Sequence, residues 1–206
     1  EILRINGLKV PSTSELLQLA SLFQLDGTPE SAETFGNGNV NDTFLVRTDS
    51  GNRYTLQRIN HDVFKDPVSL MDNFARVTTH LAQKHMDGQT TLRTLVLVPA
   101  QDGSSYLTGE YGNYWRVTEY VPGGLSLEVP KSREHAYEAA RAFGDFQYQL
   151  SDLPGDPLIE TIPDFHNTES RYQVFNKAVK QDVHGRAEEV KDLIAFAREN
   201  EQLAGM

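Results

Sequence analysis

The sequence contains a segment rich in glycine and asparagine whose composition is typical of either a tight turn or a phosphate-binding loop. It is FGNGNVND, residues 35–42. The residues that would approach a phosphate are Gly36, Asn37, Gly38, Asn39 and Val40. Glycine has no Cβ, so backbone N–H groups in such a loop can come close to phosphate oxygens. A Gly/Asn cluster between strands is also ordinary hairpin chemistry, and the segment alone does not decide between the two.

Two nucleotide-binding motifs are excluded by the residues around this loop. The dinucleotide fingerprint G-x-G-x-x-G needs a third glycine and a following helix, whereas Asn41 stands at the third position and a strand-like segment follows. The P-loop pattern G-x-x-x-x-G-K-[ST] needs a lysine after its second glycine, and none is present. The remaining possibility is a hairpin that folds over the phosphates of a nucleotide as a lid.

A lid of this kind needs a cation on the following strand to bind the phosphates. In the segment YTLQR the side chains of Tyr54, Leu56 and Arg58 share one face, because side chains alternate along a strand. Arg58 is therefore the predicted phosphate contact. A solvated charge at the end of a strand is the alternative interpretation.

A second candidate segment is WRVTEYVPGG, residues 115–124. An edge strand that runs into Pro-Gly-Gly offers alternating carbonyl and N–H groups, which match the acceptor and donor on the edge of adenine. A buried strand followed by a turn is the alternative. Neither segment is conclusive by itself.

The elements that would position these residues follow from hydrophobic periodicity. Pro11–Ser14 begins a helix, residues 43–47 and 53–59 are strands, and Pro67 begins a helix that runs to residue 84. Residues 95–98 and 114–121 are two further strands. Residues 132–204 are largely helical, with interruptions at 153–157 and Pro163. The order predicts an α+β fold, a small sheet followed by a helical part, with the boundary at Pro122 and the domains at 1–121 and 122–206.

Composition excludes several classes of protein. The formal net charge of −10 over 206 residues, without a cluster of Lys and Arg, argues against nucleic-acid binding. The longest apolar run, TLVLVPA, is too short to span a membrane. The absence of cysteine is compatible with a cytoplasmic protein and excludes a cysteine-based zinc site. The histidines are dispersed, so no metal site is predicted.

Taken together, these segments resemble the protein-kinase-like small-molecule phosphotransferases, the aminoglycoside phosphotransferase and choline kinase superfamily. TEYVPGG is similar to the hinge of kinases. Longer stretches resemble bacterial N-acetylhexosamine 1-kinases and keep their order from Gly36 to Phe175: GNGNVNDTFLV, YTLQRINHDVFKDPVSLMDNFARVTTHL, YWRVTEYV, AFGDFQ and ETIPDFHNTESRYQVF.

The resemblance implies a kinase-like N-lobe, a small antiparallel sheet plus a helix, followed by the first helices of a helical C-lobe. It implies ATP as cofactor, with adenine bound at Glu119, Tyr120 and Val121 through the Glu119 carbonyl and the Val121 N–H. The implied reaction is ATP-dependent phosphorylation of the anomeric hydroxyl of an N-acetylhexosamine. Two alternatives stay open: a kinase for another acceptor, such as an amino alcohol or aminoglycoside, and a non-catalytic kinase-like module that binds a ligand or partner.

Two departures from the family pattern concern the phosphate clamp. The helix 67–84 lacks a glutamate to brace the strand cation, and Asp72 or Asn73 occupies the approximate place. Arg58 replaces the usual lysine, although its planar fork can still bind phosphate oxygens.

A third departure is the missing catalytic loop H-[NG]-D-x-x-x-x-N. His166-Asn167 is followed by threonine and His184-Gly185 by arginine, so neither fits. We therefore expect the chain to stop before that loop, to hold no catalytic or metal residue, to need downstream residues for Mg²⁺, and to be inactive alone.

The polar segment DFHNTESR, residues 164–171, is the remaining candidate for substrate binding. His166 and Arg171 could contact an amino sugar together with Asn39 of the glycine loop. A helix N-cap at Asn167 or Thr168 explains much of the same pattern and is the favoured interpretation.

Overall fold

A computed structural model describes residues 4–5, 8–36, 40–109, 112–124 and 129–205. The chain divides into two compact units, Glu1–Thr161 and Ile162–Met206, which are described separately below. The unit boundary thus falls after Thr161. The lobe boundary at Pro122 stays a prediction.

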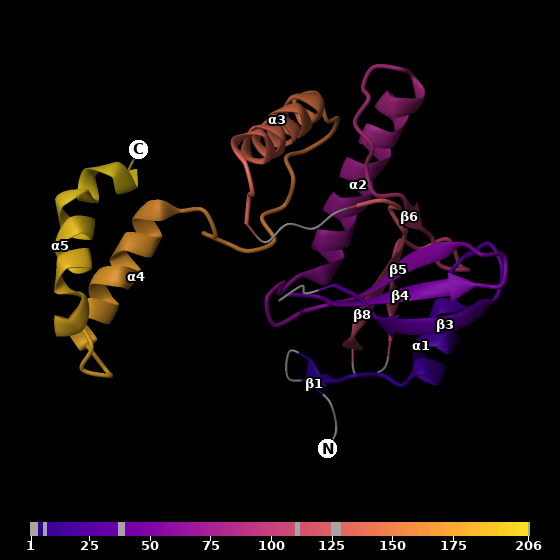
Figure 1. The fold of residues 1–206 in the computed structure, drawn as a ribbon, viewed down its shortest axis with the longest axis horizontal. Helices are drawn as coiled ribbons and strands as arrows, with labels where there is room; N and C mark the ends of the chain where they lie inside the picture. The colour runs from indigo at the N-terminus through magenta and orange to yellow at the C-terminus, as the bar shows by residue number, and fades with distance from the viewer. Residues whose placement is uncertain (1–3, 6–7, 37–39, 110–111, 125–128, 206) are drawn as a thin grey trace. The chain divides into compact units, whose positions relative to one another are not determined.

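Unit 1 contains an antiparallel sheet with the strand order β3-β4-β5-β8-β6, in which β7 also pairs with β8 (Figure 1). The strands are β3 (Pro29–Thr34), β4 (Asp42–Thr48), β5 (Arg53–Ile59), β6 (Leu97–Val98), β7 (Leu107–Thr108) and β8 (Tyr114–Glu119). A separate two-stranded ladder joins β1 (Arg4–Ile5) and β2 (Leu8–Lys9). The sheet and the helices confirm the predicted α+β class, and β3 and β4 flank the glycine loop as a hairpin.

Three helices of unit 1 begin at residues whose side chains cap them. In α1 (Thr13–Ala20), Ser12 and Glu15 form a capping box that satisfies otherwise unpaired backbone donors. The side chain of Asp66 caps α2 (Pro67–Met86), and that of Ser132 caps α3 (Arg133–Leu150).

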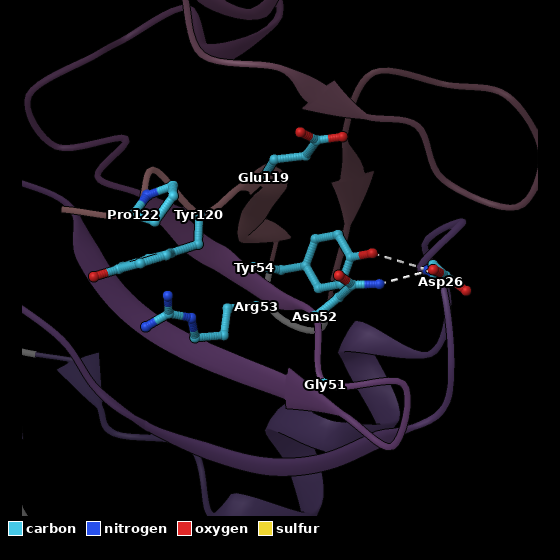
Figure 2. Close-up of a pocket in the computed structure, with 8 residues that line it drawn as sticks. All are labelled: Asp26, Gly51, Asn52, Arg53, Tyr54, Glu119, Tyr120 and Pro122. Atoms are coloured by element: carbon cyan, nitrogen blue, oxygen red, sulfur yellow. Dashed lines mark hydrogen bonds between the residues drawn. The ribbon is translucent and has the colours of Figure 1, made fainter. Parts of the chain in front are cut away.

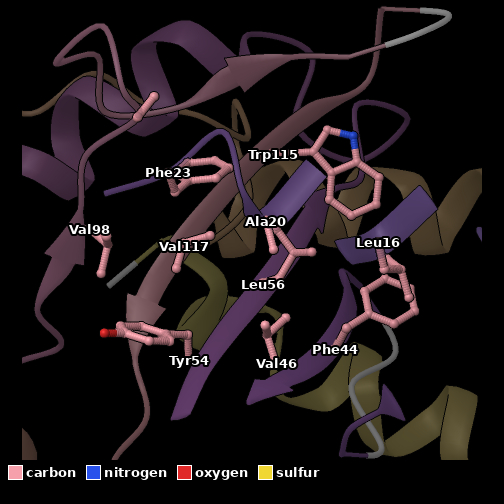
Figure 3. Close-up of a cluster of buried hydrophobic side chains, with 11 residues drawn as sticks. Leu16, Ala20, Phe23, Phe44, Val46, Tyr54, Leu56, Val98, Trp115 and Val117 are labelled. Atoms are coloured by element: carbon pink, nitrogen blue, oxygen red, sulfur yellow. The ribbon is translucent and has the colours of Figure 1, made fainter. Parts of the chain in front are cut away.

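The hydrophobic core lies between α1 and one face of the sheet (Figure 3). Alternate residues of β4, β5 and β8 point to this face, and antiparallel register sets them side by side, as in the row Phe44–Leu56–Val117. Leu16, Ala20 and Phe23 fill the space from the α1 side. Burial of these apolar side chains anchors α1 to the sheet.

Helix α2 lies against the opposite face of the sheet. Arg116, which alternates with the core residues Trp115 and Val117, contacts Met71 and Phe74 of α2. The two helices therefore pack on opposite faces (Figure 1).

The segment after α3 is bound along α2 by polar side chains. Asn73 exchanges two hydrogen bonds with the backbone of Ile159, at 2.7 and 3.1 Å. One turn further, Arg76 donates to the carbonyls of Pro154 and Asp156. Nearer the end of α2, Lys84 and His80 bind the Asp152 carboxylate and the carbonyl of Gln149.

Unit 2 is helical, as predicted. It comprises α4 (Thr168–Gln181), the 3₁₀ turns η2 (Glu188–Val190) and η3 (Glu201–Gly205), and α5 (Lys191–Glu199). Helix α4 ends at Asp182, whose left-handed conformation closes the helix. Across the described parts of both units, no helix has the length and apolarity needed to cross a membrane.

Candidate functional site

The face of the sheet opposite α1 carries a row of polar side chains. Thr43, Gln57 and Arg116 lie on neighbouring strands in direct register. The Gln57 amide donates to the Thr43 hydroxyl at 3.1 Å and accepts from Arg116 Nε at 3.0 Å. The Phe35 amide donates to the Thr43 carbonyl, which extends the row to the beginning of the glycine loop. The row therefore connects the glycine loop with β8.

Arg116 is the buried cation of this row. Its residue surface is 9% exposed, its guanidinium lies over the Phe74 ring at 4.1 Å, and its Nη1 group is 3.9 Å from the Met71 sulfur. Burial lowers the pKa of the Arg116 guanidinium to about 10, because the interior disfavours its charged form. Arg116 still carries its charge at neutral pH.

In residues 119–121, at the end of β8 and just after it, some backbone amides donate hydrogen bonds and one has no described acceptor. The Glu119 amide donates to the Val96 carbonyl and the Tyr120 amide to the Arg53 carbonyl. The Val121 amide makes no hydrogen bond to any residue that the structure describes, and the Val121 residue is 54% exposed. An open amide at this position is compatible with the adenine contact that the sequence predicts.

A polar cavity of about 370 Å³ borders this segment. Figure 2 shows its lining residues: Asp26, Gly51, Asn52, Arg53, Tyr54, Glu119, Tyr120 and Pro122. Asp26 fixes one wall, because its carboxylate accepts from Asn52 and its amide donates to the Tyr54 hydroxyl. The Arg53 guanidinium lies over the Tyr120 ring at 4.2 Å. The cavity thus combines a charged group and ring surface beside the predicted hinge.

The glycine loop and the predicted hinge meet through their aromatic side chains. The rings of Phe35 and Tyr120 contact each other edge to face, with centroids 5.8 Å apart. Gly36, the next residue after Phe35, has φ +78°, and a Cβ built there would meet nothing within 4 Å. Val40 is 39% exposed. Asn37, Gly38 and Asn39 lie outside the described residues, so their predicted roles stay predictions.

Arg58 lies on the α1 face and not on the face that carries the polar row. Its guanidinium is paired with the Asp42 carboxylate, with Nη2–Oδ2 at 2.5 Å and Nε–Oδ2 at 2.7 Å, and it lies 5.6 Å from the centre of the Trp115 ring. The Arg58 and Asp42 side chains are 5% and 3% exposed. This placement does not support a ligand contact by Arg58, whose phosphate role stays a prediction.

The predicted brace on α2 has a different partner. Asn73 binds the backbone of Ile159, and Asp72 is exposed. The α2 side chains that contact a strand cation are Met71 and Phe74, and the cation is Arg116. The interpretation of the sequence missed these contacts, because it expected a polar side chain on α2 and the cation on β5. The sequence did contain a signal for Arg116, because it stands between the apolar residues Trp115 and Val117 of a predicted strand.

The polar segment before α4 is used to start that helix. Asn167 is the N-cap, and its side chain accepts from the Ser170 amide at 2.9 Å, which confirms the capping interpretation. Arg171 donates to the Phe165 carbonyl and lies over the Phe165 ring, while His166 contacts the same ring and is exposed. Their substrate roles stay predictions.

No group of three or more His, Asp or Glu side chains that could hold a metal ion occurs among the residues that the structure describes.

Comparison with known proteins identifies both the family and the fold. The family model described as "Phosphotransferase enzyme family" matches residues 31–205. A microcompartment-associated aminopropanol kinase has a TM-score of 0.53 at 14% identity, covering 81% of this chain and 55% of its own. An amicoumacin kinase in complex with AMP-PNP and Ca²⁺ also has a TM-score of 0.53, at 12% identity, covering 83% and 53%.

A spectinomycin phosphotransferase in complex with ADP and spectinomycin has a TM-score of 0.50 at 9% identity, covering 93% of this chain and 58% of its own. The present chain thus spans somewhat more than half the length of these three proteins. At these identities the likeness concerns the fold, which is the α+β arrangement of small-molecule kinases.

Proposed function

The chain belongs to the phosphotransferase enzyme family, and on this basis we propose that it binds ATP for the transfer of a phosphoryl group to a hydroxyl of a small molecule. Residues 1–121 would form the nucleotide-binding lobe, and residues 122–206 the hinge exit and the first part of the helical lobe. The glycine loop would cover the phosphates, and Glu119–Val121 would bind adenine.

The observation that carries this proposal is the open Val121 amide beside the contact between Phe35 and Tyr120. An N–H at the end of a strand that donates to no described residue can supply the donor that the adenine edge requires. The aromatic contact brings the beginning of the glycine loop to the same place. One nucleotide could therefore reach both segments.

We propose an N-acetylhexosamine as the acceptor, phosphorylated at its anomeric hydroxyl. The ordered resemblance from Gly36 to Phe175 supports this choice. Asn39, His166 and Arg171 are the residues proposed to contact the sugar. The aminopropanol and spectinomycin kinases with the same fold favour a second candidate, an amino alcohol or an aminoglycoside-like acceptor.

Calorimetric titration of the 206-residue chain with ATP, ADP and adenosine tests the nucleotide part. We expect all three to bind, with the phosphates adding affinity. If none of them binds, the proposed function is wrong.

The acceptor is tested with the protein as its gene encodes it, in a coupled assay of ATP turnover. The panel contains N-acetylglucosamine, N-acetylgalactosamine, choline, aminopropanol and an aminoglycoside. We expect turnover with the N-acetylhexosamines. Turnover only with choline, aminopropanol or the aminoglycoside would favour the second candidate acceptor over an N-acetylhexosamine. Nucleotide binding without any turnover would favour the non-catalytic module.

A further inference from the structure

Arg116 places a positive charge inside the face of the sheet opposite α1, where no carboxylate of a described residue balances it. Its described neighbours are the Gln57 amide, the Met71 sulfur and the Phe74 ring. No Asp or Glu among the described residues forms an ion pair with it. Buried charges in proteins are normally paired, because removing an ion from water is costly.

Arg58 provides the internal comparison. It is also buried and lies on the neighbouring strand, but Asp42 neutralises it on the α1 face. The same small sheet therefore holds two buried guanidinium groups, and only one of them has a described carboxylate partner. The guanidinium without a described carboxylate partner is Arg116, on the face that carries the polar row Thr43, Gln57 and Arg116.

The position of Arg116 relative to the proposed site follows from strand alternation. Arg116, Thr118 and Tyr120 occupy alternate positions along β8 and its continuation, so their side chains leave the same side of the strand. Tyr120 meets Phe35 of the glycine loop, and Arg116 is joined through Gln57 to Thr43, the residue that directly follows the segment 35–42. A polyphosphate covered by the loop would lie on this face.

We propose that Arg116 is the cation that binds the phosphates of the nucleotide, and that Gln57 and Phe74 are its positioning residues. This inference rests on the proposed ATP binding and names the residue that would serve it. The Gln57 carbonyl oxygen fixes Nε, and the Phe74 ring supports the guanidinium plane. The Nη2 group, which makes no hydrogen bond to a described residue, is left to donate to a phosphate oxygen.

In this arrangement the phosphate-binding cation is Arg116 of β8, held by Gln57 of β5 and the Phe74 ring. The sequence had instead suggested Arg58 of β5, held by a polar side chain of α2. Phe74 can hold a guanidinium in place without neutralising it, whereas a carboxylate would compete with the phosphates. The charge stays available for the ligand.

The experiment compares ADP with adenosine, because the two ligands differ only in the phosphates. Calorimetry gives both dissociation constants for the wild-type chain and for Arg116→Gln and Arg116→Lys, and thermal unfolding shows that each variant is folded. We expect Arg116→Gln to weaken ADP binding by about tenfold to about a hundredfold while adenosine binding is unchanged, since a charge-assisted hydrogen bond is lost. Arg116→Lys should lie between, because it keeps the charge but not the fork.

Two further variants make the result specific. Arg47→Gln removes an arginine that is half-exposed on β4 and should leave the ratio of the two dissociation constants unchanged. Gln57→Ala should lower ADP affinity through loss of the Nε contact, with little effect on adenosine. Inorganic tripolyphosphate should compete with ADP in the wild type and fail to compete in Arg116→Gln.

A folded Arg116→Gln variant that keeps the wild-type ratio of ADP to adenosine affinity would overturn the inference, and Arg116 would then be structural. Absence of adenosine binding in the wild type is a different failure, because it contradicts the proposed nucleotide site itself. If the wild type binds adenosine and ADP with the same affinity, that result also contradicts the proposal that Arg116 binds the phosphates.

Discussion

Arg58 and Asp42 form an ion pair inside the protein, directly opposite each other on β5 and β4. Two guanidinium nitrogens approach one carboxylate oxygen, and the pair closes the end of the core that α1 covers. A buried pair of this kind contributes little by itself, but removing one member of it is strongly destabilising.

Arg58→Met should therefore destabilise unit 1 by about 3–5 kcal/mol, because the Asp42 carboxylate stays buried. The double variant Asp42→Leu, Arg58→Met should recover most of this loss, since it removes both charges. Denaturation in urea measures all three free energies of unfolding. If Arg58 instead binds phosphate, the folded double variant will lose ADP affinity relative to adenosine, contrary to our expectation.

Gly36→Ala should weaken ATP binding with only a modest loss of stability. The position has φ +78° and open space around the missing Cβ, so the cost of the substitution is backbone strain of about 1–2 kcal/mol. Gly103→Ala is a matched control, because Gly103 has φ +85° and equally open surroundings in the turn after β6. Equal ATP affinity in the two variants would argue against the lid. Gly38→Val should also weaken ATP binding without loss of fold.

Val121→Pro should weaken ATP and adenosine binding alike, because proline removes the open amide that adenine would use. Val121→Ala keeps the amide and should bind both ligands normally. The loss is expected to be about tenfold, since one net hydrogen bond is lost. Competition by tripolyphosphate should be unaffected, since the phosphates bind elsewhere. An unchanged adenosine affinity in the proline variant would show that the Val121 amide does not bind adenine.

Asp152→Asn should lower stability in a pH-dependent way. The hydrogen bond from Lys84 is the main cause that lowers the pKa of the Asp152 carboxyl below 3.8; partial burial opposes it, and the hydrogen bond from His80 adds to the lowering. A lowered folded pKa means that the carboxylate stabilises the fold above pH 3.8, and this stabilisation is lost as the pH falls through the folded pKa.

The difference in unfolding temperature between wild type and Asp152→Asn is the measurement. It should be largest at about pH 6 and smaller at about pH 3, because the unfolded carboxyl takes up its proton at a higher pH than the folded one. Added salt should reduce it, because the carboxylate is on the surface. A difference that is the same at both pH values would mean that Asp152 acts through its shape and not its charge.

The sequence predicted most of the elements in their order, although β1, β2, β3 and β7 were not predicted. Alternation identified β4, β5 and β8, and Pro11–Ser14, Pro67 and Ser132 marked helix starts. These are local properties, set by a few neighbouring residues. The N-cap at Asn167 was predictable for the same reason.

The tertiary structure decided which side of the sheet each strand residue occupies. Alternation separates Leu56 and Arg58 from Gln57 but does not say which set faces α1. That choice depends on packing between α1 and strands far along the chain, which buries Arg58 against Asp42. Cross-strand register then joined Gln57 to Arg116, and α2 supplied Phe74, so the unbalanced cation emerged only when distant segments came together.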